Sequence, residues 1–190
     1  MSDISANAIV AGVRRAVADN GPGGATMERI ADAMGVSRMT LHRRGLSREA
    51  IIAALREEME REERDAQWPA MTAAGSAHER LELALRALCG VTEANLDLLQ
   101  ALGADAWDAV YHDAGDDALT RREFTAPLRR LLEDGAADGT LDPGRDLDET
   151  ATVLYNQVGW TYRHLRSGHR WRPQRAEDAV VRLALNGVGR

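Results

Sequence analysis

Residues 25–50 of this chain read ATMERIADAMGVSRMTLHRRGLSREA. Hydroxyl residues, which are favoured N-caps, precede three segments with helical spacing, at Thr26, Ser37 and Ser47. A Gly-Val pair makes a tight turn between the first two segments. A helix, a tight turn and a second helix predict a helix-turn-helix unit, in which the second helix enters the DNA major groove and the first crosses the backbone.

The same part of the chain concentrates positive charge in an acidic protein. The 190 residues carry a formal net charge of −6, but residues 1–50 hold seven arginines against five acidic residues, so the remainder stands at −8. This asymmetry indicates a small basic module that meets a polyanion, attached to a body that would repel one. All 24 basic residues are arginine, which excludes lysine-dependent chemistry.

The composition excludes several other classes of protein. No apolar run reaches the ~18 residues that a membrane-spanning helix needs, and the first residues lack the charged and then apolar order of a secretory signal. A single cysteine, Cys89, excludes an internal disulfide and a cysteine-based zinc site. We therefore expect a cytoplasmic protein with no membrane partner.

Helical spacing recurs along the rest of the chain, whereas the period-2 alternation of strands is absent. The predicted fold class is therefore all-α. The predicted helices cover about 3–20, 27–34, 38–44, 48–67, 76 onward, 95–110, 118–138, 147–167 and 173–186. Ser76 with Glu79, and Asp146 with Glu149, form capping boxes at the start of two of them.

The fourth predicted helix changes character along its length. Its first half carries apolar residues at helical spacing up to Met59, but residues 60–65 read EREERD and have no apolar face. Glu-Arg pairs four residues apart support an exposed helix. We therefore predict that the second half is solvated and that the helix ends before Pro69, which cannot donate a helical hydrogen bond.

The stretch ATMERIADAMGVSRMTLHRRGLSREAIIAAL, residues 25–55, resembles the N-terminal module of the tetracycline-repressor (TetR) family. The shared pattern is a Thr-capped helix, Ile-Ala, a Gly-Val-Ser turn, Thr-Leu or Thr-Ile, an aromatic residue and Ser-Lys-Glu at the start of the fourth helix. Beyond this stretch only the helix count and the length agree. The resemblance implies a three-helix helix-turn-helix module joined by a long fourth helix to a C-terminal helical bundle that binds a small molecule and dimerises. The expected domains are 1–47 and 48–190, with residues 48–67 as the connecting helix.

Several side chains of the helix-turn-helix unit are predicted to contact DNA. Arg38 and Thr40 lie near the start of the second helix, where base contacts are made, and Met39 is ambiguous. The later basic residues are placed for phosphates. The full predicted set is Thr26, Ser37, Arg38, Met39, Thr40, His42, Arg43, Arg44 and Arg48, whereas Leu41 should face inward.

Three residues depart from the family pattern. His42 stands where the family usually has Tyr, and Arg44 where it has His, and both keep a polar group for a phosphate. Gly45 replaces a Phe that packs between the first and fourth helices. We expect Leu46 to fill that space after a small backbone shift, which glycine permits.

The resemblance also implies a ligand cavity between the helices that start near 76, 95, 118 and 146. The predicted lining is Thr92, Trp107, Tyr111, Phe124, Leu128, Tyr155, Gln157, Trp160 and His164. Few polar groups among many apolar ones favour an uncharged or weakly polar, partly aromatic ligand. The last two helices resemble the pair through which the family dimerises.

These features predict a homodimeric transcriptional regulator, a repressor, that binds a palindromic operator in double-stranded DNA and is released by a small-molecule effector. No catalytic residue, metal site or cofactor is predicted, because the chain lacks Glu-x-x-His, HExxH, GxSxG and phosphate-loop motifs. Two alternatives stay open. One is a helical ligand-binding or scaffolding dimer that has lost DNA binding, in which Gly45→Phe should stabilise the module or restore binding. The other is a small all-α enzyme.

Overall fold

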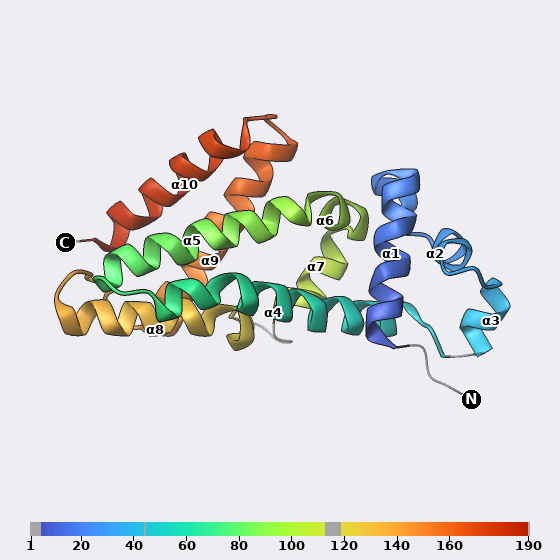
Figure 1. The fold of residues 1–190 in the computed structure, drawn as a ribbon, viewed down its shortest axis with the longest axis horizontal. Helices are drawn as coiled ribbons and strands as arrows, with labels where there is room; N and C mark the ends of the chain where they lie inside the picture. The colour runs from blue at the N-terminus through green and yellow to red at the C-terminus, as the bar shows by residue number, and fades with distance from the viewer. Residues whose placement is uncertain (1–4, 44, 113–118, 190) are drawn as a thin grey trace. The chain divides into compact units, whose positions relative to one another are not determined.

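A computed structural model describes residues 5–43, 45–112 and 119–189, without the side chains of Pro22, Leu102 and 104–107 (Figure 1). The described residues form ten α-helices and no strand, which confirms the all-α prediction. The helices are α1 Ala6–Asn20, α2 Met27–Ala33, α3 Arg38–Arg43, α4 Arg48–Thr72, α5 Ala77–Ala94, α6 Leu96–Leu102, α7 Ala104–Tyr111, α8 Arg122–Asp138, α9 Leu147–Ser167 and α10 Pro173–Val188, with a 3₁₀ turn at Pro22–Gly24. None of them is both long and apolar enough to cross a membrane.

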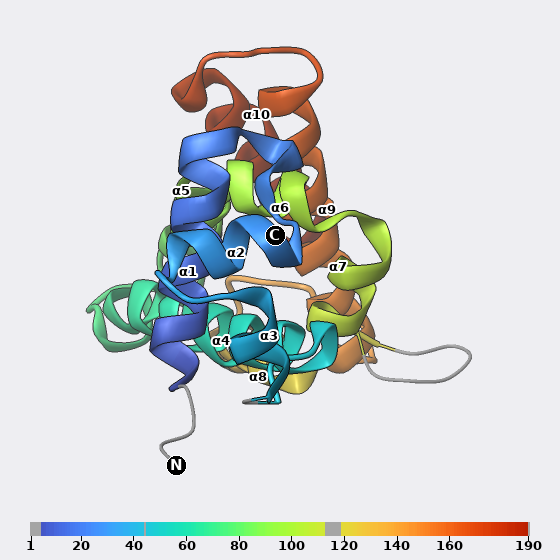
Figure 2. The same cartoon turned by 90° about the vertical axis from the view of Figure 1, so that its right-hand side faces the viewer.

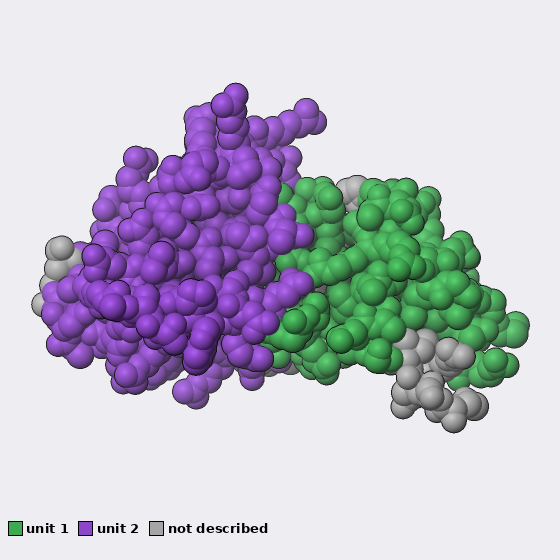
Figure 3. Space-filling view, in the orientation of Figure 1, with its two compact units in different colours: residues 1–61, 95–114 green, residues 62–94, 115–190 purple. Residues whose placement is uncertain are grey.

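The helices group into two compact units, coloured green and purple in Figure 3. The first unit holds Met1–Arg61 and Asn95–Ala114, and the second holds Glu62–Ala94 and Gly115–Arg190. The first unit therefore adds the start of α4, together with α6 and α7, to the three helices of the predicted module. Functional domains at 1–47 and 48–190 remain a prediction.

In the first unit, α1, α2 and α3 form the predicted helix-turn-helix arrangement (Figure 2). The apolar face of α1 is buried as predicted, at Ile9, Val13, Ala16 and Val17. Thr26 caps α2 because its hydroxyl accepts a hydrogen bond from the amide of Arg29 at 3.3 Å.

The turn between α2 and α3 depends on Gly35, which has a φ of +68°. In this left-handed conformation its amide bonds the carbonyl of Asp32 (2.9 Å), and the amide of Val36 bonds that of Ala31 (3.0 Å). The two bonds form a Schellman motif, which closes a helix and satisfies its last carbonyls. Glycine adopts this conformation at no steric cost, and this explains the sharp stop before Ser37.

Two predicted helix boundaries are wrong. The segment 95–110 is not one helix, because Gly103, at a φ of +74°, separates α6 from α7. The fourth helix does not end before Pro69 but runs on to Thr72. Beyond the proline its last turn is held by the amide of Ala73 on the Pro69 carbonyl (2.9 Å) and by the Thr72 hydroxyl on the Trp68 carbonyl (3.1 Å).

The second half of α4 is also less solvated than predicted. Glu63, Gln67 and Ala70 are buried there, continuing the stripe that begins with Leu55 and Met59. Residues three or four apart share one face of a helix, so Glu63, Gln67 and Ala70 form one buried face of the part of α4 that belongs to the second unit. The charged residues between them, which suggested full exposure, occupy the other faces of the helix.

The second unit is a bundle in which α5, α8, α9 and α10 pack on one another. Its core is dominated by leucine, with Leu81, Leu85, Leu128 and Leu131 fully buried. The start of α9 is where the sequence predicts it, and the carboxylate of Asp146 accepts from the amide of Glu149 (2.9 Å).

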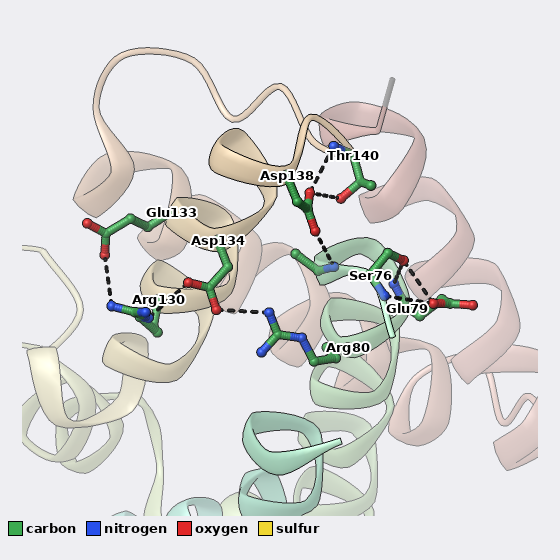
Figure 4. Close-up of polar contacts among 9 residues, drawn as sticks. Ser76, Glu79, Arg80, Arg130, Glu133, Asp134, Asp138 and Thr140 are labelled. Carbon is green, nitrogen blue, oxygen red and sulfur yellow. Dashed lines mark hydrogen bonds and ion pairs between the residues drawn. The ribbon is translucent and has the colours of Figure 1, made fainter. Parts of the chain in front are cut away.

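One end of the bundle is tied by polar contacts between α5 and α8 (Figure 4). Ser76 and Glu79 form the predicted capping box, since each side chain bonds the backbone amide of the other residue (Glu79 amide to Ser76 Oγ, 3.3 Å; Ser76 amide to Glu79 Oε2, 2.9 Å). Arg80 pairs with Asp134 at 2.9 Å, and the Asp138 carboxylate accepts from the amide of Ala77 at 2.9 Å. These bonds fix the register of the two helices.

Candidate functional site

Helix α3 has one buried side and one exposed side. Leu41 is fully buried, as predicted, and anchors the helix in the first unit. Arg38, His42 and Arg43 are exposed, and Met39 is 80% exposed. Four of the nine residues predicted to contact DNA therefore stand on the free surface of a helix of six residues.

The start of α3 is organised by its own hydroxyl groups and by a bond to α2. The hydroxyl of Ser37 accepts from the amide of Thr40 (3.1 Å) and lies 2.9 Å from the Thr40 hydroxyl. The guanidinium of Arg38 contacts the carboxylate of Glu28, on α2, at 3.1 Å, and both side chains are largely exposed. An exposed ion pair of this kind contributes little stability and exchanges readily for another anion.

The remaining predicted DNA contacts lie at the ends of neighbouring helices. Thr26 is exposed at the start of α2, and Arg48 is exposed at the start of α4. Arg48 also borders a hollow of about 340 Å³ whose apolar walls include Val13, Ile30 and Ile51. Arg44 lies outside the described residues.

The turn from α3 to α4 explains the glycine that replaces the family's phenylalanine. Gly45 has a φ of +74°. Its amide bonds the carbonyl of His42 and the amide of Leu46 bonds that of Leu41, both at 3.0 Å, which makes a second Schellman motif. Leu46 is buried, as expected for the residue that takes over the space of the Phe. A side chain at this position is strained at this φ, which argues against the expectation, made for a module that has lost DNA binding, that Gly45→Phe would stabilise it.

The structure disperses the predicted ligand-lining residues. Tyr111 is buried in the first unit, and the side chain of Trp107 lies outside the described residues. Phe124, Leu128 and Tyr155 are buried in the second unit, where the rings of Phe124 and Tyr155 lie 6.0 Å apart. This aromatic pair is the part of the predicted set that the fold brings together in the core of the bundle.

The other predicted lining residues of the second unit do not join that pair. The Thr92 hydroxyl is satisfied by the Leu88 carbonyl of its own helix (2.8 Å). Trp160 is 41% exposed and lies under the guanidinium of Arg163, and His164 is exposed. Gln157 borders a surface hollow of about 470 Å³ between α9 and α10.

Two polar residues of the core were not predicted, Glu63 and Gln67 of α4. Glu63 is 3% exposed and Gln67 1%. The hydroxyl of Tyr155 donates to Glu63 Oε1 at 2.5 Å. Burial raises the pKa of Glu63 to about 8, and the hydrogen bond from Tyr155 opposes this rise without cancelling it.

Three polar atoms of this pair are buried without a hydrogen-bond partner among the described residues. They are Glu63 Oε2 and both amide atoms of Gln67, Oε1 and Nε2. The signal that could have found them is spacing, since 59, 63 and 67 continue the apolar stripe of α4 at intervals of four. Because both residues are polar, this spacing alone does not identify them as buried.

A partly buried acid on α5, Glu93, has by contrast partners for both of its carboxylate oxygens. Glu93 accepts from Arg166 through both of its carboxylate oxygens (2.7 Å each) and from the hydroxyl of Tyr162 (2.9 Å). The bonds from Arg166 lower the pKa of Glu93. Glu93 therefore forms a structural ion pair with Arg166. Glu63 has no such partner among the described residues.

Comparison with known families supports the same architecture. Residues 74–188 match the family model described as tetracyclin repressor-like, C-terminal domain. This match spans more than half of the chain and covers the bundle of the second unit. No curated protein sequence matches the chain.

Solved structures share the fold over almost the whole length. One that concerns the control of antibiotic production by bacterial hormones has a TM-score of 0.71 at 18% identity and covers 100% of both chains. A tetR family transcription regulator from Shewanella sp. PV-4 has a TM-score of 0.64 at 19% identity, over 97% of this chain and 98% of that one. The regulator FadR from Bacillus subtilis, in complex with stearoyl-CoA, has a TM-score of 0.67 at 16% identity, over 96% and 99%. At these identities the likeness establishes the fold.

Proposed function

Because this chain belongs to the tetracycline-repressor family, we propose that it is a cytoplasmic transcriptional repressor that binds a palindromic operator as a dimer and leaves it when a small molecule binds. Residues 1–47 are the DNA-binding domain in this proposal, and residues 48–190 bind the effector and form the dimer. The observation that carries it is helix α3, which buries Leu41 and leaves Arg38, Met39 and His42 free at its surface.

The chemistry of α3 suits a DNA major groove. The guanidinium of Arg38 can bond the two acceptors of a guanine edge, and the side chain of Met39 can pack on a thymine methyl group. His42 and Arg43, one turn later, are placed for phosphates. In the free protein Arg38 forms an exposed ion pair with Glu28. Such a pair contributes little stability, so the edge of a base can take the place of Glu28.

A dimer is required because one α3 reads only half of a palindrome. Two-fold symmetry places two reading helices at half-sites about one DNA turn apart. The surface that we assign to the dimer is the apolar stripe on the outside of α9 and α10, formed by Val153 (56% exposed), Trp160 (41%) and Leu183 (63%). Exposed apolar side chains on two helices that pack together, as α9 and α10 do, are typical of an interface.

We infer that the effector acts through α4. This helix begins four residues after Arg44, beyond the turn that ends α3, and its second half lines the core of the second unit. A ligand that binds one position of α4 better than another shifts the population of the two, and operator affinity changes with it. FadR from Bacillus subtilis, which holds stearoyl-CoA, is a precedent for an effector in this fold.

Selection of bound duplexes from a random DNA pool tests the function. We expect the purified protein to enrich a palindrome, and Arg38→Ala to relax the selection at one position of each half-site. The affinity should fall steeply between two salt concentrations, because phosphate contacts release counterions. Recovery of no consensus, or of one indifferent to every change between 37 and 43, would leave a ligand-binding helical dimer without DNA binding as the better description.

A further inference from the structure

The buried pair Glu63 and Gln67 has the properties of a recognition site. Both side chains project from the inner face of α4 into the core of the second unit, and both are more than nine-tenths buried. Tyr155, from α9, fixes one carboxylate oxygen of Glu63. The ring of Tyr155 in turn lies 6.0 Å from that of Phe124.

A purely structural role does not account for the pair. A buried polar atom without a hydrogen bond destabilises a fold, and natural cores keep very few of them. Here three such atoms belong to two residues one helical turn apart, among the described residues. Glu93, a partly buried acid in the same unit, shows how the chain satisfies a structural carboxylate, with an arginine and a tyrosine. No such arginine contacts Glu63 within the described chain.

We propose that Glu63 and Gln67 are the polar recognition pair for the effector, and that the effector presents an uncharged group that both accepts and donates hydrogen bonds, as an amide does, next to an aromatic or apolar body. The assignment rests on the proposed function, because it supposes an effector site in the second unit. It adds the residues and the ligand class.

The hydrogen-bonding capacity of the pair defines that class. With Tyr155 donating to Oε1, a neutral Glu63 offers a donor at Oε2, and burial keeps the carboxyl neutral at pH 7 because its pKa is raised to about 8. Gln67 offers an amide NH2 group as a donor and a carbonyl oxygen as an acceptor. An amide satisfies all three atoms, since its oxygen accepts two bonds and its nitrogen donates one. A carboxylate lacks a donor and a countercharge, and an ammonium lacks an acceptor.

The test uses three probes with the same ring and different charge, benzamide, benzoate and benzylammonium. Thermal unfolding of the full chain is followed at pH 7 with each of them. We expect benzamide to raise the melting temperature by a few degrees and the two charged probes to leave it unchanged, because only a ligand that binds the native state stabilises it.

Four variants locate the effect. Gln67→Leu should raise the melting temperature without any probe, because it removes two unsatisfied polar atoms, and both Gln67→Leu and Glu63→Leu should abolish the shift given by benzamide. Glu63→Gln should retain most of that shift, since its amide is also uncharged and can donate. Glu57→Gln, at an exposed position of the same helix, is the matched control and should change neither quantity.

Infrared spectroscopy gives an independent readout. The carbonyl band of a protonated carboxyl should be present at pH 7, move when benzamide binds, and be missing in Glu63→Gln. The assignment is overturned by the absence of a benzamide shift, by an equal shift with benzoate or benzylammonium, or by a benzamide shift that survives in Glu63→Leu.

The DNA selection, run on the same preparations without probe, separates this assignment from the function. Enrichment of a palindrome by a protein that ignores benzamide would reject the recognition pair and retain the regulator. Binding of benzamide at Glu63 in a protein that enriches no sequence would support the pair and reject the regulator.

Discussion

The protonation of Glu63 is coupled to folding, because its carboxyl is buried in the native state and solvated in the unfolded one. Below pH 4.5 the carboxyl is protonated in both states and its contribution to stability is fully present. Between pH 4.5 and about 8 only the unfolded state ionises, so the free energy of unfolding should fall by roughly 1.4 kcal/mol per pH unit from this group. Above pH 8 Glu63 is ionised in both states, so the free energy of unfolding should not fall further because of this group.

Urea unfolding of the native protein and of Glu63→Gln between pH 5 and 9 measures this effect. The difference between the two proteins should grow with pH in favour of Glu63→Gln and level off near pH 8. Contributions to the pH dependence that the two proteins share cancel in the difference. A difference that does not change with pH would contradict a neutral Glu63.

Residues that act locally could be predicted from the sequence, and those that depend on packing could not. Thr26, Ser37 and Ser76 cap helices as predicted, because a cap needs only its own hydroxyl and amides two or three residues on. Glu63 and Gln67 were missed because a polar residue on the inner face of a helix has the same sequence signal as one in water. Only the fold shows which face of α4 is covered.

At the scale of elements, the turn between α3 and α4 makes a prediction about Gly45. Its left-handed backbone should make Gly45→Phe and Gly45→Ala each destabilise the first unit by about 1–2 kcal/mol, and Gly45→Asn by less. Gly90, exposed in the middle of α5 with no positive φ, is the matched control, since Gly90→Ala should stabilise by about 0.5–1 kcal/mol.

Thermal unfolding of the three Gly45 variants and the Gly90 control, each compared with the native chain, decides this point. A Gly45→Phe protein at least as stable as the native one would mean that the phenylalanine finds the space between α1 and α4 and that Leu46 does not replace it. Loss of stability in Gly45→Phe but not in Gly45→Ala would indicate a clash of the ring and not backbone strain.

The sequence predicts the end of a helix where a glycine or a capping residue forms it. It does not predict the end where tertiary packing lets the helix continue past a helix-breaking residue such as proline. Gly35 ends α2 as expected, but Gly103 was overlooked inside the predicted helix 95–110. Pro69 does not end α4, because the cost of its missing hydrogen bond is offset when the turn beyond it packs, as buried Ala70 does.

At the scale of the whole molecule, DNA binding should depend on the dimer. Leu183, 63% exposed on α10, lies four residues before Gly187, which borders the hollow between α9 and α10 together with Val153. Leu183→Glu places a charge at the centre of the proposed interface, where it is buried without a partner in both copies. We expect sedimentation to find a monomer, and operator affinity to fall by about 100-fold or more, because each half-site is then bound separately.

Leu83→Glu, at a comparably exposed leucine of α5 outside that stripe, should leave both the mass and the affinity unchanged. If Leu183→Glu stays dimeric while Leu83→Glu dissociates, the interface lies on α5 and not on the outside of α9 and α10.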